Sequence, residues 1–309
     1  MPRRTKNYEH IFNTEQTTID DYLENLRDKN IAKYWTKFIK SGDFLEISIY
    51  PLWKTSKADI LAAMPKPSRD AQILLNHKNR TKHIARIMHC NFTIYDIWAT
   101  LTYDTKHLPA DGKAALRDMQ NCIRRLKRYI KKHNLPDLKY IYVTENRIES
   151  GEIGRVHHHI IMNFADRDVA EKLWGKSQRN QTRYLSPDDF GLEGMANYLT
   201  KEKHNTEYRK HTKSYGYSKN LVHPIIERRE NLIRKRKAEN IAKNPDQAPK
   251  ILHDLAAQAP KTIRGQYDFL DLEAKYSNYI GGVYLYARMR MRQTPSTANK
   301  RKRKPREEI

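Results

Sequence analysis

Three adjacent histidines, His157, His158 and His159, stand within an apolar run of the chain. Because successive side chains of a strand point to opposite faces, His157 and His159 would share one face and His158 would lie on the other. Glycines in the preceding segment predict a hairpin over residues 141–164 that places Glu145 across from His157. Two imidazoles and one carboxylate would then meet on a sheet, an arrangement suited to a divalent metal ion with positions open for substrate.

Other interpretations of the histidine run compete with this one. The histidines could be satisfied core or surface residues, but in an apolar strand three imidazoles are costly to bury unless something binds them. A structural zinc site is also possible, but zinc prefers thiolates or a fourth ligand, and none is evident beside the histidines. Asp104, Glu149 and Glu152 are rivals to Glu145 as the third ligand. We prefer Glu145 because of its register in the hairpin.

A second chemical group lies in the segment LEGMANYLTKE, residues 192–202. Tyr198 and Lys201 are three residues apart on a predicted helix and therefore share a face. A tyrosine near an activated phosphate can attack it and become covalently linked. A nearby ammonium would offset negative charge in the transition state. Taken alone, a tyrosine and a lysine at this spacing are weak evidence for a nucleophile. The pair gains significance because it follows the histidine strand in the sequence.

The charge of the chain indicates its partner. Its 309 residues include 59 Lys and Arg against 36 Asp and Glu, a net charge of +23. This excess predicts a polyanion, and nucleic acid is the first candidate over a ribosome or a membrane surface. Two cysteines without a CxxC pair exclude a zinc ribbon and a disulfide framework, so we expect a reducing cytoplasm. The sequence contains no apolar run long enough to predict a signal peptide or a membrane span.

Periodicity predicts the elements that position these groups. Residues 1–68 are expected to be mainly helical, since apolar residues recur at helical spacing: Ile19, Tyr22, Leu23 and Leu26, and later Tyr34, Trp35 and Phe38. Within this region residues 42–53 alternate as a strand does. The order of elements that follows is β-α-β-β-α. It predicts an α+β fold in which helices pack on one face of a central antiparallel sheet.

The central part of the chain is expected over residues 69–222. Asp111 is a predicted helix N-cap there, and the helix that follows has an apolar stripe and a basic remainder. The predicted elements are a helix over 69–89, a central strand over 92–104, the helix after Asp111, strands at 139–146 and 156–164, and helices at 166–174 and 187–203. Residues 223–292 are expected to hold a very basic helix at 224–245 and two terminal strands. Residues 293–309 are expected to be a disordered basic tail.

Three motifs give the chain a family resemblance. WATLTYD (98–104), HHH (157–159) and YLTK (198–201) occur in this order. The combination closely resembles the HUH endonuclease superfamily, in which a His-hydrophobic-His strand binds the metal and a downstream YxxK supplies the nucleophile. Within that superfamily the chain is similar to the rolling-circle replication initiators of bacterial plasmids and phages. The resemblance spans roughly residues 70–292 and implies a ferredoxin-like or RRM-like core.

The sequence departs from the family pattern at two positions. His158 stands where a hydrophobic residue or a tyrosine is usual. Glu202 stands where a second tyrosine would lie, so the chain looks like the single-tyrosine class. Tyr208, Tyr215 and Tyr217 are near enough to compete with Tyr198 for the role of nucleophile. We expect Tyr198.

The resemblance implies a nicking reaction. Mg²⁺ or Mn²⁺ would be held by Glu145, His157 and His159 at the scissile phosphate of origin DNA. Attack by Tyr198 would leave a free 3′-OH and a 5′-phosphotyrosine, and the reverse step would rejoin strands. Lys201 would orient the phosphate or hold the tyrosine. Thr102 and Asp104 would help to shape the site. The residues expected to contact DNA are Arg124, Arg125, Lys127, Arg128, Lys203, Lys219, Arg234, Lys235 and Arg236.

The expected partners follow from the same resemblance. The substrate would be single-stranded or cruciform origin DNA. The segment GKS (175–177) lacks the phosphate-loop glycine, since Ala170 occupies that position, so a host helicase would separate the strands. A single-strand-binding protein and a polymerase would act with it. A relaxase or a transposase with the same chemistry, and a non-enzymatic DNA-binding regulator, are alternatives. A non-haem iron oxygenase also uses two histidines and a carboxylate, but it gives the basic charge no role.

Overall fold

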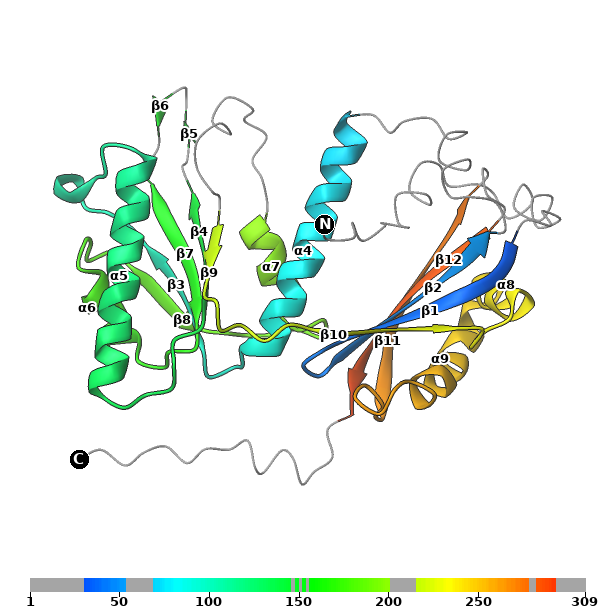
Figure 1. Cartoon of the computed structure of the whole chain (residues 1–309). Coiled ribbons are helices and arrows are strands. Elements are labelled where there is room, and N and C mark those ends of the chain that lie inside the picture. Colours follow the sequence, from blue (N-terminus) through cyan, green and yellow to red (C-terminus); the bar gives the residue numbers. More distant parts are fainter. Residues whose placement is uncertain are drawn as a thin grey trace. The chain divides into compact units, whose positions relative to one another are not determined.

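The computed structural model describes residues 31–53, 69–145, 148–149, 152–153, 156–200, 215–277 and 282–292. It divides into two compact units (Figure 1). One unit combines residues 1–75 with residues 224–309, and the other comprises residues 76–223. None of the described helices is both long and apolar enough to cross a membrane.

The unit that joins both ends of the chain is built on a five-stranded antiparallel sheet in the order β10-β1-β2-β12-β11. Its strands are β1 (Ile31–Ser41), β2 (Phe44–Trp53), β10 (Ile225–Glu230), β11 (Tyr267–Ser277) and β12 (Gly282–Met291). Helices α8 (Lys235–Lys243) and α9 (Ala248–Ala257), with the 3-10 turn Pro245–Gln247 between them, pack on one face of this sheet.

The expected helix around Tyr34, Trp35 and Phe38 is wrong, because these residues belong to strand β1. Tyr34, Thr36 and Phe38 are all buried at a spacing of two, which is the period of a strand. Helical spacing and strand spacing cannot be distinguished from three apolar positions alone. Pairing with β2 and with the distant β10 decides the outcome.

The expected basic helix at 224–245 is wrong in its first part. Residues 225–230 form the edge strand β10, in which Ile226 lies across from Ile39 of β1. Asn231 has a positive φ of 57°, which ends the extended segment, and helix α8 begins at Lys235. A partner strand from the other end of the chain overrides the helical propensity of the Arg-rich and Glu-rich sequence.

The second unit contains another five-stranded antiparallel sheet, in the order β8-β3-β7-β4-β9. Its strands are β3 (Ile97–Leu101), β4 (Tyr140–Glu145), β7 (His157–Met162), β8 (Gln181–Tyr184) and β9 (Tyr215–Tyr217). A two-residue ladder of β5 (Ile148–Glu149) with β6 (Glu152–Ile153) extends the hairpin between β4 and β7, as the glycines of this segment predict. A 3-10 turn, Thr105–His107, follows β3.

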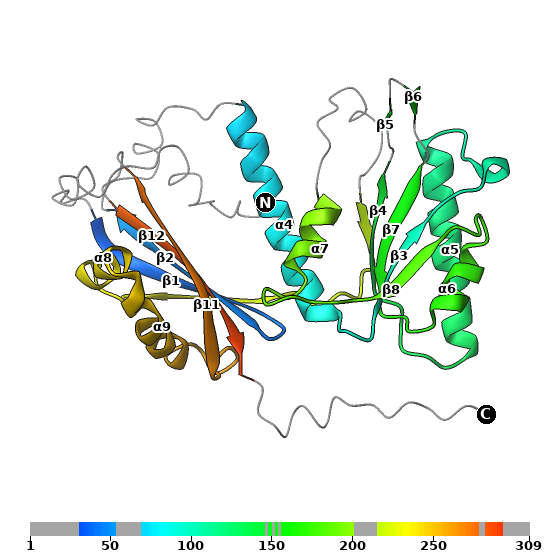
Figure 2. The same cartoon turned by 180° about the vertical axis from the view of Figure 1, so that it is seen from behind.

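Helices cover both faces of this second sheet. Helices α5 (Gly112–Lys132) and α6 (Arg167–Trp174) lie on one side, and α4 (Arg69–Asn91) and α7 (Glu193–Thr200) lie on the other (Figures 1 and 2). The α+β class and the antiparallel sheet are confirmed, but helices on a single face are wrong for this unit. The strands are apolar on both faces, with Ile97 and Ile160 facing α5 while Trp98 and Ile161 face α4. Such strands need cover on each side.

The predicted cap of helix α5 is confirmed. The carboxylate of Asp111 accepts a hydrogen bond of 2.6 Å from the backbone N–H of Ala114. This bond satisfies one of the amide groups left without a partner at a helix N-terminus. The apolar stripe of the helix, which includes Met119 and Leu126, is buried against the sheet.

Gly216 gives the edge strand β9 its close approach to Tyr142. A Cβ at this position would lie 2.6 Å from ring carbons of Tyr142. We therefore expect Gly216→Ala to displace the ring and to lower the free energy of unfolding by about 1–3 kcal/mol. Urea denaturation measures this, with Gly194→Ala as control, where the nearest atom would be 3.7 Å away. A wild-type midpoint for Gly216→Ala would contradict the prediction.

Candidate metal centre and nucleophile

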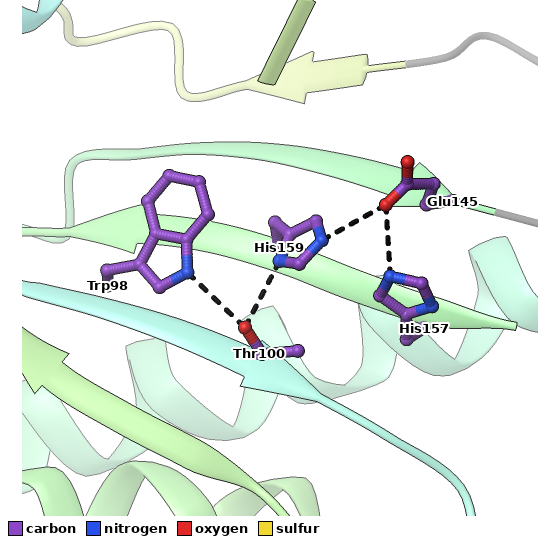
Figure 3. Close-up of polar contacts among 5 residues, drawn as sticks. All are labelled: Trp98, Thr100, Glu145, His157 and His159. Atoms are coloured by element: carbon purple, nitrogen blue, oxygen red, sulfur yellow. Dashed lines mark hydrogen bonds and ion pairs between the residues drawn. The ribbon is translucent and has the colours of Figure 1, made fainter. Parts of the chain in front are cut away.

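Glu145, His157 and His159 converge on one face of the second sheet. Strands β4 and β7 pair so that Glu145 lies directly across from His157, as the hairpin register predicts. Oε2 of Glu145 is 3.0 Å from Nε2 of His157 and 3.2 Å from Nε2 of His159 (Figure 3). One ligand atom from each residue lies within 4.8 Å of the others. The cluster is therefore compact enough for a single metal ion.

The chemistry of this cluster fits a divalent cation. Hydrogen bonds from His157 and His159 hold the pKa of Glu145 well below its usual range, so the carboxylate is ionised at neutral pH. The side chain of Glu145 is 32% exposed and that of His159 is 5% exposed, so the cluster opens to solvent at the carboxylate. Two imidazoles and one carboxylate are a usual donor set for a metal with open positions.

The rival carboxylates do not join this cluster where they are described. Asp104 accepts a hydrogen bond from the hydroxyl of Ser177 instead. The side chains of Glu149 and Glu152 lie outside the described residues. Glu145 is thus the carboxylate that the structure brings to the two histidines.

Two residues on β3 hold the side of the His159 ring that faces away from Glu145. The indole Nε1 of Trp98 donates to the hydroxyl of Thr100 at 3.3 Å, and that hydroxyl lies 3.1 Å from Nδ1 of His159 (Figure 3). With Nδ1 engaged, Nε2 is directed at Glu145. Such partners orient the ligands of metal sites. Trp98 and Thr100 are not among the site residues predicted from the sequence, although their alternation on the motif strand places them on one face.

Tyr198 lies beside the cluster. Its ring is edge-on to that of His159, with ring centroids 5.1 Å apart, and edge-on to that of Trp98 at 5.6 Å. The side chain is 54% exposed, which is high for a large aromatic residue that contacts a buried imidazole. The structure therefore brings the predicted nucleophile and the predicted metal ligands to the same place.

Helix α4 fixes the position of the helix that carries Tyr198. The hydroxyls of Thr81 and Thr200 form a buried hydrogen bond of 2.6 Å between the two helices. At the other end of α7, the backbone N–H of Leu192 donates to Nε2 of His89 at 2.9 Å. Ala196 and Leu199 pack into the same core as residues of α4. Both ends of the short helix are thus held.

Several other predicted site residues cannot be placed. Lys201, Lys203 and Tyr208 lie outside the described residues, as does the side chain of Tyr215. Tyr217 is exposed on β9, where its register partner is Ile141 of β4. Tyr217 therefore shares a face of the sheet with Ile141. Ile141 and Glu145 are four positions apart on β4, so Glu145 lies on that face too. Tyr217 therefore remains a rival to Tyr198.

The middle histidine belongs to the opposite face of the sheet. His158 is fully buried, its Nδ1 is 2.9 Å from the hydroxyl of Thr144, and its Nε2 is 2.9 Å from the hydroxyl of Tyr103. Tyr103 in turn hydrogen-bonds Asp118, which forms an ion pair with Lys176. Burial lowers the pKa of His158 to about 3, so it is neutral. The two-faced arrangement predicted from strand alternation is confirmed.

One proton arrangement satisfies every group of this chain of hydrogen bonds. Thr144 donates to Nδ1, Nε2–H donates to Tyr103, and Tyr103 donates to Asp118. His158→Leu would leave the half-buried hydroxyl of Thr144 without its imidazole partner. We expect it to lower the free energy of unfolding by about 1–3 kcal/mol, measured by urea denaturation. In combination with Thr144→Val the losses should be less than additive. Additive losses would argue against the hydrogen bond.

The basic residues predicted to bind DNA are spread over separate surfaces. Arg124, Lys127 and Arg128 are exposed on α5, which covers the face of the sheet opposite the metal centre. Arg125 instead donates hydrogen bonds to the carbonyl groups of Leu173 and Trp174 and so ties α5 to the end of α6. Lys219 is exposed after β9. Arg234, Lys235 and Arg236 lie at the start of α8 in the other unit.

Thr102 and Asp104 bind the loop between α6 and β8. The hydroxyl of Thr102 lies 3.0 Å from Oγ of Ser177, and that Oγ donates to Asp104 at 3.1 Å. The end of α6, from which this loop starts, is held by a hydrogen bond of 2.6 Å from the indole of Trp174 to the carbonyl of Thr102. These two residues hold a loop near the site, and their role in shaping the site stays a prediction.

The described geometry is that of an α+β domain with a candidate metal cluster on an antiparallel sheet. Residues 96–217 match the model of the family described as replication-associated protein ORF2/G2P. The matched segment includes Glu145, His157, His159 and Tyr198. The match is consistent with a rolling-circle replication initiator and supports a role in the initiation of replication. Comparisons with curated proteins and with solved structures give no significant match.

Proposed function

We propose that this protein starts rolling-circle replication by nicking origin DNA with Tyr198 at a metal centre held by Glu145, His157 and His159. The observation that carries the proposal is the edge-on contact of an exposed tyrosine with a ring of the candidate metal cluster. The match of residues 96–217 to a replication-associated family supports DNA as the substrate. The net charge of +23 favours a polyanionic partner.

The residues of the chain have distinct roles in this reaction. Trp98 and Thr100 keep Nε2 of His159 directed at the centre. Mg²⁺ or Mn²⁺, when bound, would polarise the scissile phosphate and offset its charge. The phenolic oxygen of Tyr198 attacks phosphorus, and the bond from phosphorus to the 3′ oxygen breaks. The phenol loses its proton and the departing oxygen gains one, which leaves a free 3′-OH and a 5′-phosphotyrosine.

The partners of the proposed reaction follow from its chemistry. Single-stranded or cruciform origin DNA would present an unpaired phosphate to Tyr198. A polymerase would extend the 3′-OH, and a helicase and a single-strand-binding protein would manage the displaced strand. Because the phosphotyrosine retains the energy of the phosphodiester, attack by a 3′-OH would rejoin ends without ATP. A relaxase or a transposase would share every chemical step, and the cleaved sequence distinguishes them.

The proposal is tested by incubating the protein with Mn²⁺ and a pool of single-stranded oligonucleotides that includes the replicon's own origin. We expect a DNA-dependent shift on a denaturing protein gel, and mass spectrometry of the digested adduct should recover the nucleotide on the peptide that contains Tyr198. EDTA should abolish the shift, because the ligand cluster would then be empty. A protein that binds this DNA but forms no adduct with any of it would favour a non-enzymatic regulator.

A further inference from the structure

An exposed row of side chains lies on edge strand β8, beside the metal centre. Strand β8 pairs with β3 so that Gln181 lies directly across from Thr100 and Arg183 directly across from Trp98. Directly opposed residues of paired strands project to the same face of the sheet. Gln181 and Arg183 therefore share the face of His159, the ligand that Thr100 supports.

The loop that leads into β8 adds Arg179 to this row. Its carbonyl oxygen lies 3.1 Å from the hydroxyl of Thr102, and its N–H donates to Oγ of Ser177 at 3.0 Å. The backbone of Arg179 is thus held at the end of β3, two residues before Gln181. Arg179, Gln181 and Arg183 are all exposed. We call these three residues the β8 row.

The other two residues of β8, Thr182 and Tyr184, point to the opposite face of the sheet, which α6 covers. Tyr184 donates a hydrogen bond to the carbonyl of Ala165 near the start of α6, and the guanidinium of Arg167 lies 5.7 Å from the centre of its ring. The hydroxyl of Thr182 is buried. The two faces of the strand therefore differ: one contributes to packing around α6, and the other presents two guanidinium groups and one amide to solvent.

Charged edge strands also have a structural explanation, because arginine on an edge discourages pairing with another chain. That explanation does not require the charges to lie on a particular face. Here they lie on the face of the metal centre, where a phosphate would have to bind. Guanidinium groups recognise phosphate oxygens through paired hydrogen bonds, and an amide can recognise the edge of a base.

We propose that the β8 row binds the single-stranded DNA that adjoins the scissile phosphate, an inference that rests on the proposed nicking function. Arg179 and Arg183 bind backbone phosphates. They are four residues apart in the sequence, at most roughly 13 Å of backbone, and we assign them to different phosphates. Gln181, between them and across from Thr100, contacts a base. The row thus sets which nucleotides lie beside Tyr198.

The test compares Arg179→Gln/Arg183→Gln with a control pair, Lys113→Gln/Arg117→Gln. The control residues are exposed on α5, which covers the opposite face, and the same charge is removed. Binding of the single-stranded origin oligonucleotide is measured in EDTA over a range of salt concentrations. For the β8 pair we expect the slope of log affinity against log salt to shrink by about 1.4, or about 0.7 for each phosphate that is no longer neutralised. The control pair should keep the wild-type slope.

Further variants distinguish the effect of a lost charge from the effect of a disturbed fold. Arg179→Lys/Arg183→Lys should retain the wild-type slope, because the charges remain. Gln181→Leu should keep the slope and lose the preference for one base near the nick. An equal loss of slope in both Gln pairs would overturn the proposal in favour of general electrostatics, as would an unchanged slope in the β8 pair. A wild type that binds without forming an adduct would contradict the nicking function alone, because the binding comparison does not need cleavage.

Discussion

Tyr198→Phe is expected to abolish covalent attachment to DNA, with a rate at least about 10⁴-fold below that of the wild type. The substitution removes the attacking oxygen and keeps the ring, whose edge-on contacts with His159 and Trp98 hold it in place. Folding and DNA affinity should therefore be unchanged. The rate is measured from the time course of the DNA-dependent shift on a denaturing gel with Mn²⁺ present.

Tyr217→Phe is the matched control for this variant. Tyr217 is also an exposed tyrosine, and it lies on the same face of the sheet as Glu145. The Tyr217→Phe protein should form the DNA adduct at the wild-type rate. Loss of the adduct in Tyr217→Phe together with its survival in Tyr198→Phe would move the nucleophile to β9. Survival in both variants would direct attention to Tyr208 or Tyr215.

Glu145→Gln is expected to weaken Mn²⁺ binding by at least about 100-fold, since partners that merely orient a ligand already contribute 10-fold to 100-fold. Gln is close in shape, but it removes the negative charge that faces both Nε2 atoms. Affinity is measured by titration of free Mn²⁺ with electron paramagnetic resonance. Thr100→Val, which removes the hydroxyl beside Nδ1 of His159, should weaken binding by about 10-fold to 100-fold.

Asp104→Asn provides the control for the choice of carboxylate. From the sequence, Asp104 was an alternative to Glu145 as the third metal ligand. In the structure its carboxylate accepts a hydrogen bond from the hydroxyl of Ser177. The substitution should leave Mn²⁺ affinity unchanged. If Asp104→Asn weakened binding as much as Glu145→Gln, or if Glu145→Gln had no effect, the ligand set would have to be revised. Loss of nicking should follow loss of metal binding across the three variants.

Much of the candidate site could be predicted because it depends on local periodicity. Strand alternation alone separates His157 and His159 from His158, and the structure agrees, with His158 in a buried hydrogen-bond chain on the other face. The hairpin places Glu145 across from His157, since a short connection between antiparallel strands determines their register. The cap at Asp111 is local in the same sense.

Other features depended on contacts between distant parts of the chain. The segment around Tyr34 became a strand because it pairs with β2, next along the chain, and with β10, which follows almost two hundred positions later in the sequence. The helix pattern at 224–245 failed for the same reason. Arg125 looked like its basic neighbours on α5, and the position of α6 gives it carbonyl partners within the protein. No periodicity within a single segment encodes these pairings.

The amino-acid sequence by itself determined the histidine face, its carboxylate and the basic character of the chain, because strand geometry and composition act over short distances. The tertiary structure decided what surrounds them. It set Tyr198 against His159 through the packing of α7 on α4. It also placed Gln181 and Arg183 beside the ligand strand through the pairing of β8 with β3. The register between segments separated in the chain is set by the packing of the whole unit, and so the neighbours of the site emerge only on folding.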